Sequence, residues 1–171
     1  MIASVAFRNF KALRTASVVL GPFNLVIGPN GSGKTSLIEA LLRLRALAKL
    51  PLAAPAVMPR ADAPDIAFQF GPPHAGLTAR MSCVSDYTCN LLQVAPSEAP
   101  GWSGLRTDLA GIRSYLLDHY AMAQPAPRTA DGPLASNGSN LAAVLAGLQE
   151  RQPEVFAALT AEFARILPEF A

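Results

Sequence analysis

The strongest constraint on the fold of this chain is a glycine-rich motif, Gly28-Pro29-Asn30-Gly31-Ser32-Gly33-Lys34-Thr35, which is followed by Ser36. It matches the pattern G-x-x-x-x-G-K-[ST], the Walker A signature, which lies between a strand and a helix. The run Phe23 to Ile27 before it is apolar and favours a buried central strand. The residues from Lys34 to Leu50 contain neither Pro nor Gly and repeat leucine at helical spacing. The sequence therefore predicts a strand, a phosphate-binding loop and a helix in direct succession.

Each residue type in this motif has a physical use at a phosphate group. Glycines at positions 28, 31 and 33 let successive backbone N–H groups point toward a phosphate chain. The loop opens onto a helix N-terminus, where free N–H groups and the helix dipole favour an anion. Lys34 can bring an ammonium group to the β- and γ-phosphates, and the Thr35 hydroxyl can ligate Mg²⁺. We expect residues 28–36 to bind ATP with Mg²⁺. The alternative is a glycine-rich turn that contains Lys34 by chance.

The composition fits one soluble globular domain. The chain has 171 residues, of which 51% are hydrophobic and 15% charged, so it can bury a core. Its formal net charge of +2 is too small to indicate a nucleic-acid partner. The first residues lack the uninterrupted apolar run of a signal peptide. No stretch reaches the roughly 18 to 20 apolar residues of a membrane span. We expect a cytoplasmic protein with no membrane partner.

The two cysteines, Cys83 and Cys89, show no metal-site pattern. They have no C-x-x-C spacing and no nearby pair of histidines. We expect both to be buried strand residues that form neither a zinc site nor a disulfide and have no redox role.

Apolar periodicity and the positions of Pro and Gly predict the remaining elements. Strands are expected at residues 2–8, 17–20 and 23–27 and, as a three-stranded meander, within 65–94. Helices are expected at residues 34–50, 105–121, 141–149 and 154–167. The Pro/Ala-rich residues 51–64 are expected to be a linker or an insertion.

Residues 4–44 resemble the amino-terminal lobe of RecF/SMC-like ABC ATPases, including predicted ATPases related to overcoming-lysogenization nucleases. The features that carry the resemblance are Asn9-Phe10-Lys11, Phe23-Asn24, the P-loop itself and Leu37-Ile38-Glu39-Ala40. A weaker likeness to the same group lies in residues 137–145. In such heads the basic residue of the Asn-Phe-Lys segment lies near the nucleotide. The resemblance therefore implies a nucleotide contact for Lys11, and the alternative is a solvated surface lysine.

The resemblance implies an α/β fold of the P-loop NTPase kind, with an antiparallel β-layer beside a parallel sheet and helices toward the carboxyl end. It also implies a single, partial ATPase head over residues 1–171. The expected parts are the nucleotide-binding unit (1–50), the linker (51–64), the meander (65–94) and a mainly helical region (105–171). Complete heads of this kind dimerise around two ATP molecules and act on DNA or with a partner effector. A homodimer, a missing carboxyl-terminal half and DNA are therefore the expected partners.

Two motifs of a complete ABC head are not recognisable: a Ser-Gly-Gly signature loop and a Walker B strand ending in Asp-Glu. Tyr115-Leu116-Leu117-Asp118 resembles the end of a Walker B strand, but His119 stands where the glutamate would be. Asp118 is therefore read as an ordinary helix residue, and Gln69 as a solvent-facing strand residue. No catalytic residue is assigned. Two hypotheses remain: the amino-terminal half of an ATP-hydrolysing head, and a module that binds nucleotide without hydrolysing it.

Overall fold

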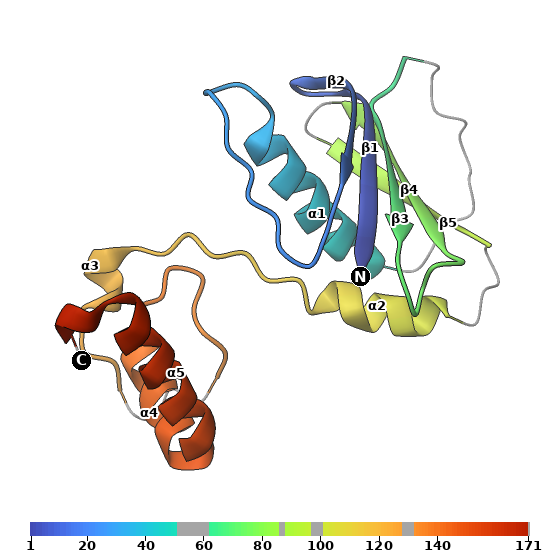
Figure 1. Ribbon diagram of the computed structural model, residues 1–171. Coiled ribbons are helices and arrows are strands. Elements are labelled where there is room, and N and C mark those ends of the chain that lie inside the picture. The colour runs from blue at the N-terminus through green and yellow to red at the C-terminus, as the bar shows by residue number, and fades with distance from the viewer. Residues whose placement is uncertain (51–61, 86–87, 97–100, 128–131, 171) are drawn as a thin grey trace. The chain divides into compact units, whose positions relative to one another are not determined.

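The computed structural model describes residues 1–50, 62–85, 88–96, 101–127 and 132–170. They belong to two compact units, Met1–Ile112 and Arg113–Ala171 (Figure 1). Most of the linker expected at residues 51–64 lies outside the described residues.

The first unit is built on a five-stranded antiparallel sheet with the strand order β2-β1-β3-β4-β5. The strands are β1 (Ile2–Phe10), β2 (Leu13–Val19), β3 (Asp65–Phe70), β4 (Thr78–Ser85) and β5 (Thr88–Ala95). The expected three-stranded meander is confirmed as β3, β4 and β5. The first two expected strands are longer than predicted and form a hairpin, in which Phe7 lies opposite Ala16.

Strand alternation gives the sheet one apolar face and one polar face. Val5 and Phe7 of β1, Phe68 of β3 and Met81 of β4 are buried, while Arg8 beside them is exposed. The helix α1 (Lys34–Ala48) covers the apolar face, and α2 (Trp102–Ala110) lies across one end of the sheet (Figure 1). They contribute the buried side chains Leu37, Ala40, Leu44, Ala48, Leu105 and Leu109. Each fully buried large apolar side chain stabilises this packing by about 1.5–3 kcal/mol relative to an exposed one.

The segment Phe23–Ile27, expected to be a buried central strand, forms no strand. Phe23, Leu25 and Ile27 are 85%, 75% and 80% exposed. A strand needs hydrogen-bonding partners along its edges, and within the described residues nothing pairs with this segment. β1 is occupied on both sides by β2 and β3. The expected parallel sheet is therefore not found in the described part of the chain, whose fold is mixed α/β with an antiparallel sheet.

The helix expected over residues 105–121 is wrong for residues 111–118. α2 ends at Ala110, and the chain then runs without a helix to the short helix α3 (His119–Met122). The Leu116 N–H donates to the Ser136 carbonyl at 2.8 Å, a bond that holds this part of the chain in the extended form. The spacing of apolar residues alone does not predict the break at Gly111.

Two further helices of the second unit are confirmed, α4 (Leu141–Arg151) and α5 (Pro153–Ile166), and a short 3-10 turn (Pro168–Phe170) follows them. Pro153 stands in the first turn of α5, where its missing N–H costs no hydrogen bond. Asn140 occupies the N-cap position of α4, but its side chain bonds the preceding loop at Ala135 and Pro133.

The expectation that Cys83 and Cys89 form no disulfide is wrong. The two residues lie opposite each other in the β4–β5 register and are joined by a disulfide. Cys83 is buried, as expected for a strand residue in the core. The pairing depends on the strand register, which the spacing of the two cysteines in the sequence does not reveal.

Candidate functional site: the loop between residues 28 and 36

The glycine-rich loop ends in a left-handed turn that begins α1. Gly31 and Gly33 have φ values of +81° and +94°, a region that favours glycine. Gly33 is the N-cap of α1, and its carbonyl accepts from the Leu37 N–H at 3.0 Å. A Cβ atom on Gly33 would lie 2.5 Å from Cδ2 of Leu13. Position 33 therefore needs glycine both for its conformation and for its close approach to β2.

The N-terminus of α1 is open to an anion. Residues 28–32 are exposed, no side chain caps the first turn of α1, and that turn contains no acidic residue. The first N–H groups of a helix have no intrahelical partners and carry a partial positive charge. The loop therefore presents donors and positive potential without a competing carboxylate. These are the properties that a nucleotide phosphate requires.

The side chain of Lys34 folds back over the loop. Its ammonium Nζ donates to the carbonyls of Gly28 at 2.8 Å and Pro29 at 2.7 Å. These acceptors are neutral, and a charged phosphate oxygen would bind the ammonium more strongly. The structure thus brings together Lys34 and the start of the loop, which the motif predicted to act together.

The two hydroxyl groups after Lys34 have different surroundings. Thr35 is exposed, whereas Ser36 is buried in the first turn of α1. The exposed hydroxyl of Thr35 is therefore available to a metal ion. Among the described residues, no group of three or more His, Cys, Asp or Glu side chains could hold a metal ion by itself.

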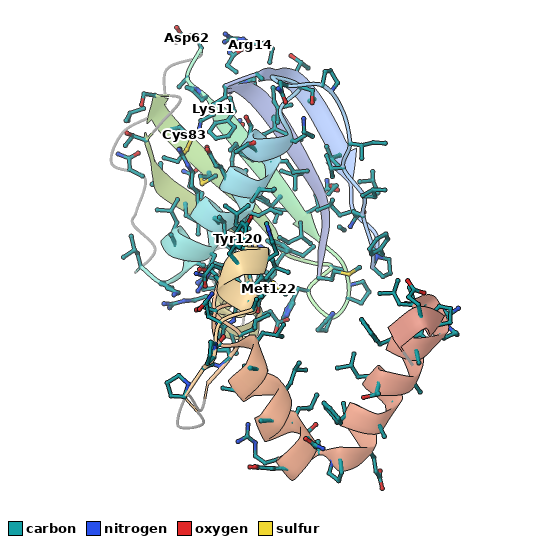
Figure 2. All side chains as sticks on the ribbon, turned by 90° about the vertical axis from the view of Figure 1, so that its left-hand side faces the viewer. Lys11, Arg14, Asp62, Cys83, Tyr120 and Met122 are labelled. Atoms are coloured by element: carbon teal, nitrogen blue, oxygen red, sulfur yellow. A yellow bond between two sulfur atoms is a disulfide. The ribbon has the colours of Figure 1, made fainter. Side chains whose placement is uncertain are left out.

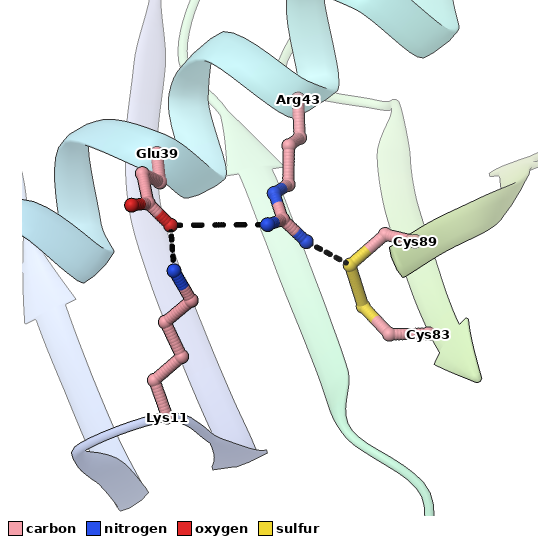
Figure 3. Close-up of a disulfide and its surroundings, with 5 residues drawn as sticks. All are labelled: Lys11, Glu39, Arg43, Cys83 and Cys89. Carbon is pink, nitrogen blue, oxygen red and sulfur yellow. Dashed lines mark hydrogen bonds and ion pairs between the residues drawn. A yellow bond between two sulfur atoms is a disulfide. The ribbon is translucent and has the colours of Figure 1, made fainter. Parts of the chain in front are cut away.

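Lys11 lies in the turn between β1 and β2 with φ +50°. Its Nζ contacts Oε2 of Glu39 on α1, and its side chain is 20% exposed (Figure 3). The Lys11 ammonium is therefore ion-paired and partly exposed. Glu39 also faces Arg43 one helical turn later, with Nη2 at 3.8 Å from Oε2. Lys11 thus connects the β1–β2 turn to the helix that begins at the P-loop. A contact between Lys11 and a nucleotide stays a prediction.

Leu13 and Arg43 were not identified from the sequence as parts of this region, and Glu39 was named only among the features of the family resemblance. The spacing of Glu39 and Arg43 is a recognisable signal, because residues four apart lie on the same face of a helix. No sequence signal indicates that Leu13 packs against Gly33 or that Glu39 pairs with Lys11, since both contacts depend on how the hairpin docks on α1.

The other residues considered from the sequence have structural roles. Oδ1 of Asp118 accepts from the Tyr120 N–H at 2.8 Å, so Asp118 is the N-cap of α3 rather than a residue within a helix. Gln69 is exposed on β3, as expected, and accepts from the Ser4 hydroxyl at 3.0 Å. Figure 2 shows Lys11 and Cys83 in the sheet unit and Tyr120 and Met122 on α3.

Comparison with known proteins supports the interpretation of the loop. Residues 1–67 match the family described as AAA ATPase domain. The DNA replication and repair protein RecF of Aliivibrio fischeri (strain MJ11) is 46% identical over 44 residues. The RecF proteins of Shigella dysenteriae serotype 1 and Escherichia coli O1:K1 are each 43% identical over 44 residues. The amino-terminal part of the chain is therefore similar to the AAA ATPase domain and to RecF proteins.

The similarity covers a limited part of each protein. The 44 matched residues are 25% of this chain and 12% of each of the three RecF proteins. A separate observation concerns membranes: none of the helices in the described residues has the length and apolar character needed to cross a bilayer.

Proposed function

Because residues 1–67 match an AAA ATPase domain and are partly RecF-like, we propose that this chain binds ATP with Mg²⁺ through residues 28–36. The observation that carries the proposal is the position of Lys34. Its ammonium group lies on two backbone carbonyls of the loop, at the head of a helix with an uncapped first turn. A nucleotide phosphate chain would replace those carbonyls as the partner of Lys34.

Each group of the loop has a defined part in this proposal. Backbone N–H groups at Gly31 and Gly33 and in the first turn of α1 donate to the phosphates. Lys34 neutralises charge at the β- and γ-phosphates, and the Thr35 hydroxyl ligates Mg²⁺. The metal ion, when bound, bridges phosphate oxygens and spreads their negative charge. The proposal places the chain in the cytoplasm, where ATP is available.

The direct test is calorimetric titration of ATP–Mg²⁺ into the wild type, Lys34→Ala and Lys49→Ala. A hydrogen bond to a charged group contributes about 1.5–3 kcal/mol, so Lys34→Ala should weaken binding about tenfold to a hundredfold. Lys49→Ala removes the same charge from beyond the end of α1 and should bind like the wild type. Equal affinities of all three proteins would rule out the P-loop site.

The proposed role of Thr35 needs a separate measurement, because it concerns the metal and not the phosphate. Thr35→Ala should weaken ATP binding more in Mg²⁺ than in EDTA, while Thr35→Ser keeps the hydroxyl and should retain the difference between the two buffers. A loss of similar size in both buffers would count against metal ligation.

The wider proposal is that this chain supplies the amino-terminal half of an ATP-hydrolysing ABC-type head that acts on DNA or with a partner effector. The similarity to the DNA replication and repair protein RecF supports a nucleic-acid context. The second half of the head, or a second copy of this chain, would provide groups that position water and face the γ-phosphate. The second candidate, a module that binds ATP without hydrolysing it, is favoured by the absence of a recognisable Walker B motif from the 171-residue sequence.

Phosphate release tests whether this chain carries hydrolytic groups of its own. We expect the 171-residue chain alone to release phosphate no faster than Lys34→Ala. Hydrolysis needs groups that orient the attacking water and stabilise transition-state charge, each contributing on the order of a hundredfold or more. A Lys34-dependent rate of about 0.1 per second or faster, against a typical turnover of about 10 per second, would show that this chain carries those groups itself.

A further inference from the structure

The disulfide between Cys83 and Cys89 joins β4 to β5 beside the helix that begins at the P-loop (Figure 3). Cys83 is only 2% exposed, whereas Cys89, on the edge strand β5, is partly exposed. An external thiol can therefore reach the sulfur of Cys89 more readily than that of Cys83. The two sulfur atoms of this bond are chemically equivalent but sterically different.

Arg43 of α1 lies beside the more accessible sulfur. Its Nη1 donates to Sγ of Cys89 at 3.2 Å, and its other terminal nitrogen faces Glu39 at 3.8 Å. The Arg43 guanidinium also lies over the ring of the fully buried Phe10, with Cζ 5.4 Å from the ring centre. Contacts on several sides therefore fix the guanidinium next to Cys89.

A disulfide sulfur is a weak and neutral acceptor, so it gains little from a guanidinium. A thiolate gains far more, because a cationic neighbour stabilises the deprotonated form of cysteine. Arg43 therefore stabilises the thiolate of Cys89 relative to the thiolate of an isolated cysteine. The β4–β5 pair is also held by its backbone ladder, with Thr78 opposite Ala95 and Ser85 opposite Thr88. The covalent bond can thus open without separating the strands.

We propose that Cys83 and Cys89 form a reversible thiol–disulfide site in which Cys89 is the sulfur that exchanges with external thiols and Arg43 stabilises its thiolate. The reaction partner is a dithiol reductant of the thioredoxin class. The site uses no group of the P-loop, so it stands independently of ATP binding.

The exchange proceeds in two balanced steps. A thiolate of the reductant attacks Sγ of Cys89, the bond between the two protein sulfurs breaks, and Cys83 leaves as a thiolate that takes a proton from water. The second thiolate of the reductant then attacks its own sulfur in the mixed disulfide and releases Cys89 as a thiolate beside Arg43. The protein gains two electrons, and the dithiol loses two and becomes a disulfide.

The first test compares two single-cysteine variants, Cys83→Ser and Cys89→Ser, treated with oxidised glutathione and followed by mass spectrometry. Cys89 in the first variant should form the mixed disulfide at least about tenfold faster than Cys83 in the second, since exchange depends on access. Equal rates, or faster reaction at Cys83, would overturn the assignment of Cys89. Circular dichroism checks that both variants are folded. The wild type, reduced beforehand, should re-form the Cys83–Cys89 disulfide under the same treatment. If both thiols stayed free, the proposal of a thiol–disulfide site would be overturned.

The second test concerns Arg43 and uses the Cys83→Ser background. Without Arg43, we expect the thiolate fraction of Cys89 to fall about tenfold at neutral pH. The more basic thiolate that remains is a stronger nucleophile, which offsets part of this loss, so Arg43→Met should slow the alkylation of Cys89 about threefold. Arg45→Met removes one charge from the same helix and should leave the rate unchanged, while Arg43→Lys should restore part of it. Equal rates for Arg43→Met and Arg45→Met would overturn the role of Arg43.

Discussion

Strand β1 and the segment Phe23–Ile27 look alike in the sequence and differ in the structure. Both are short, apolar and rich in β-forming residues. β1 lies inside the sheet between β2 and β3, and its Phe7 is 3% exposed. The second segment pairs with nothing in the described part of the chain, and its Phe23 is 85% exposed.

The difference shows what an apolar β pattern predicts. Such a pattern indicates that a segment can lie in a sheet, but the sheet forms only where another strand satisfies its N–H and C=O groups. β1 finds that partner a few residues later, through the turn that leads into β2. Phe23–Ile27 leads instead into the P-loop, and a hydrogen bond from the Gly21 N–H to the Asn24 side chain fixes its start.

The largest expected effect comes from making the same substitution in both regions. Phe7→Ala should destabilise the sheet unit by about 3–5 kcal/mol, the usual cost of removing a buried phenylalanine. Phe23→Ala should change the stability by less than about 0.5 kcal/mol, because exposed side chains contribute little. Urea unfolding followed by the fluorescence of Trp102, the single tryptophan of the chain, measures both. A loss at Phe23 as large as that at Phe7 would mean that Phe23–Ile27 is packed in solution.

An intermediate effect is expected at the contact that joins the P-loop to the hairpin. Gly31→Ala and Gly33→Ala both place a side chain at positive φ, which costs roughly 1–2 kcal/mol. Only Gly33→Ala also meets Leu13, so it should cost about 1–3 kcal/mol more, as overpacked sites do.

The combination of Gly33→Ala with Leu13→Ala sharpens this measurement. Removing the Leu13 side chain should recover part of the additional cost, because the two positions are in contact. Additive losses in the double variant would show that the hairpin and the P-loop do not touch in solution.

The smallest effect is expected at Asn24, which closes the turn at the start of the segment. Its side chain accepts from the Gly21 N–H at 2.9 Å and donates to the Gly21 carbonyl at 2.9 Å. These bonds are exposed, so Asn24→Ala should cost about 0.5–1 kcal/mol in the same unfolding experiment. Asn30→Ala, in the P-loop, is the matched control and should leave the free energy of unfolding unchanged. Identical stabilities of the two variants would show that the turn does not hold the segment.

Local patterns in the sequence predicted much of the fold. The periodicity of leucine and alanine located α1, α4 and α5, and the Pro- and Gly-rich residues 71–76 separated the first two strands of the meander. The break of the expected helix at Gly111 was missed, since the apolar spacing continues beyond it. At the candidate site the motif predicted that Lys34 brings its ammonium to a phosphate chain; the structure shows this ammonium on the carbonyls of Gly28 and Pro29, and the phosphate contact stays a prediction.

The sequence by itself determined the glycine-rich loop that begins α1, because residues 28–36 are consecutive and their conformation depends on local backbone geometry. Tertiary structure decided three other features: the disulfide of Cys83 with Cys89, the contact of Lys11 with Glu39, and the lack of a strand at Phe23–Ile27. Each depends on which neighbours a segment meets. Strand register and the docking of the hairpin on α1 fix those neighbours, and both arise from packing between residues that are distant in the chain.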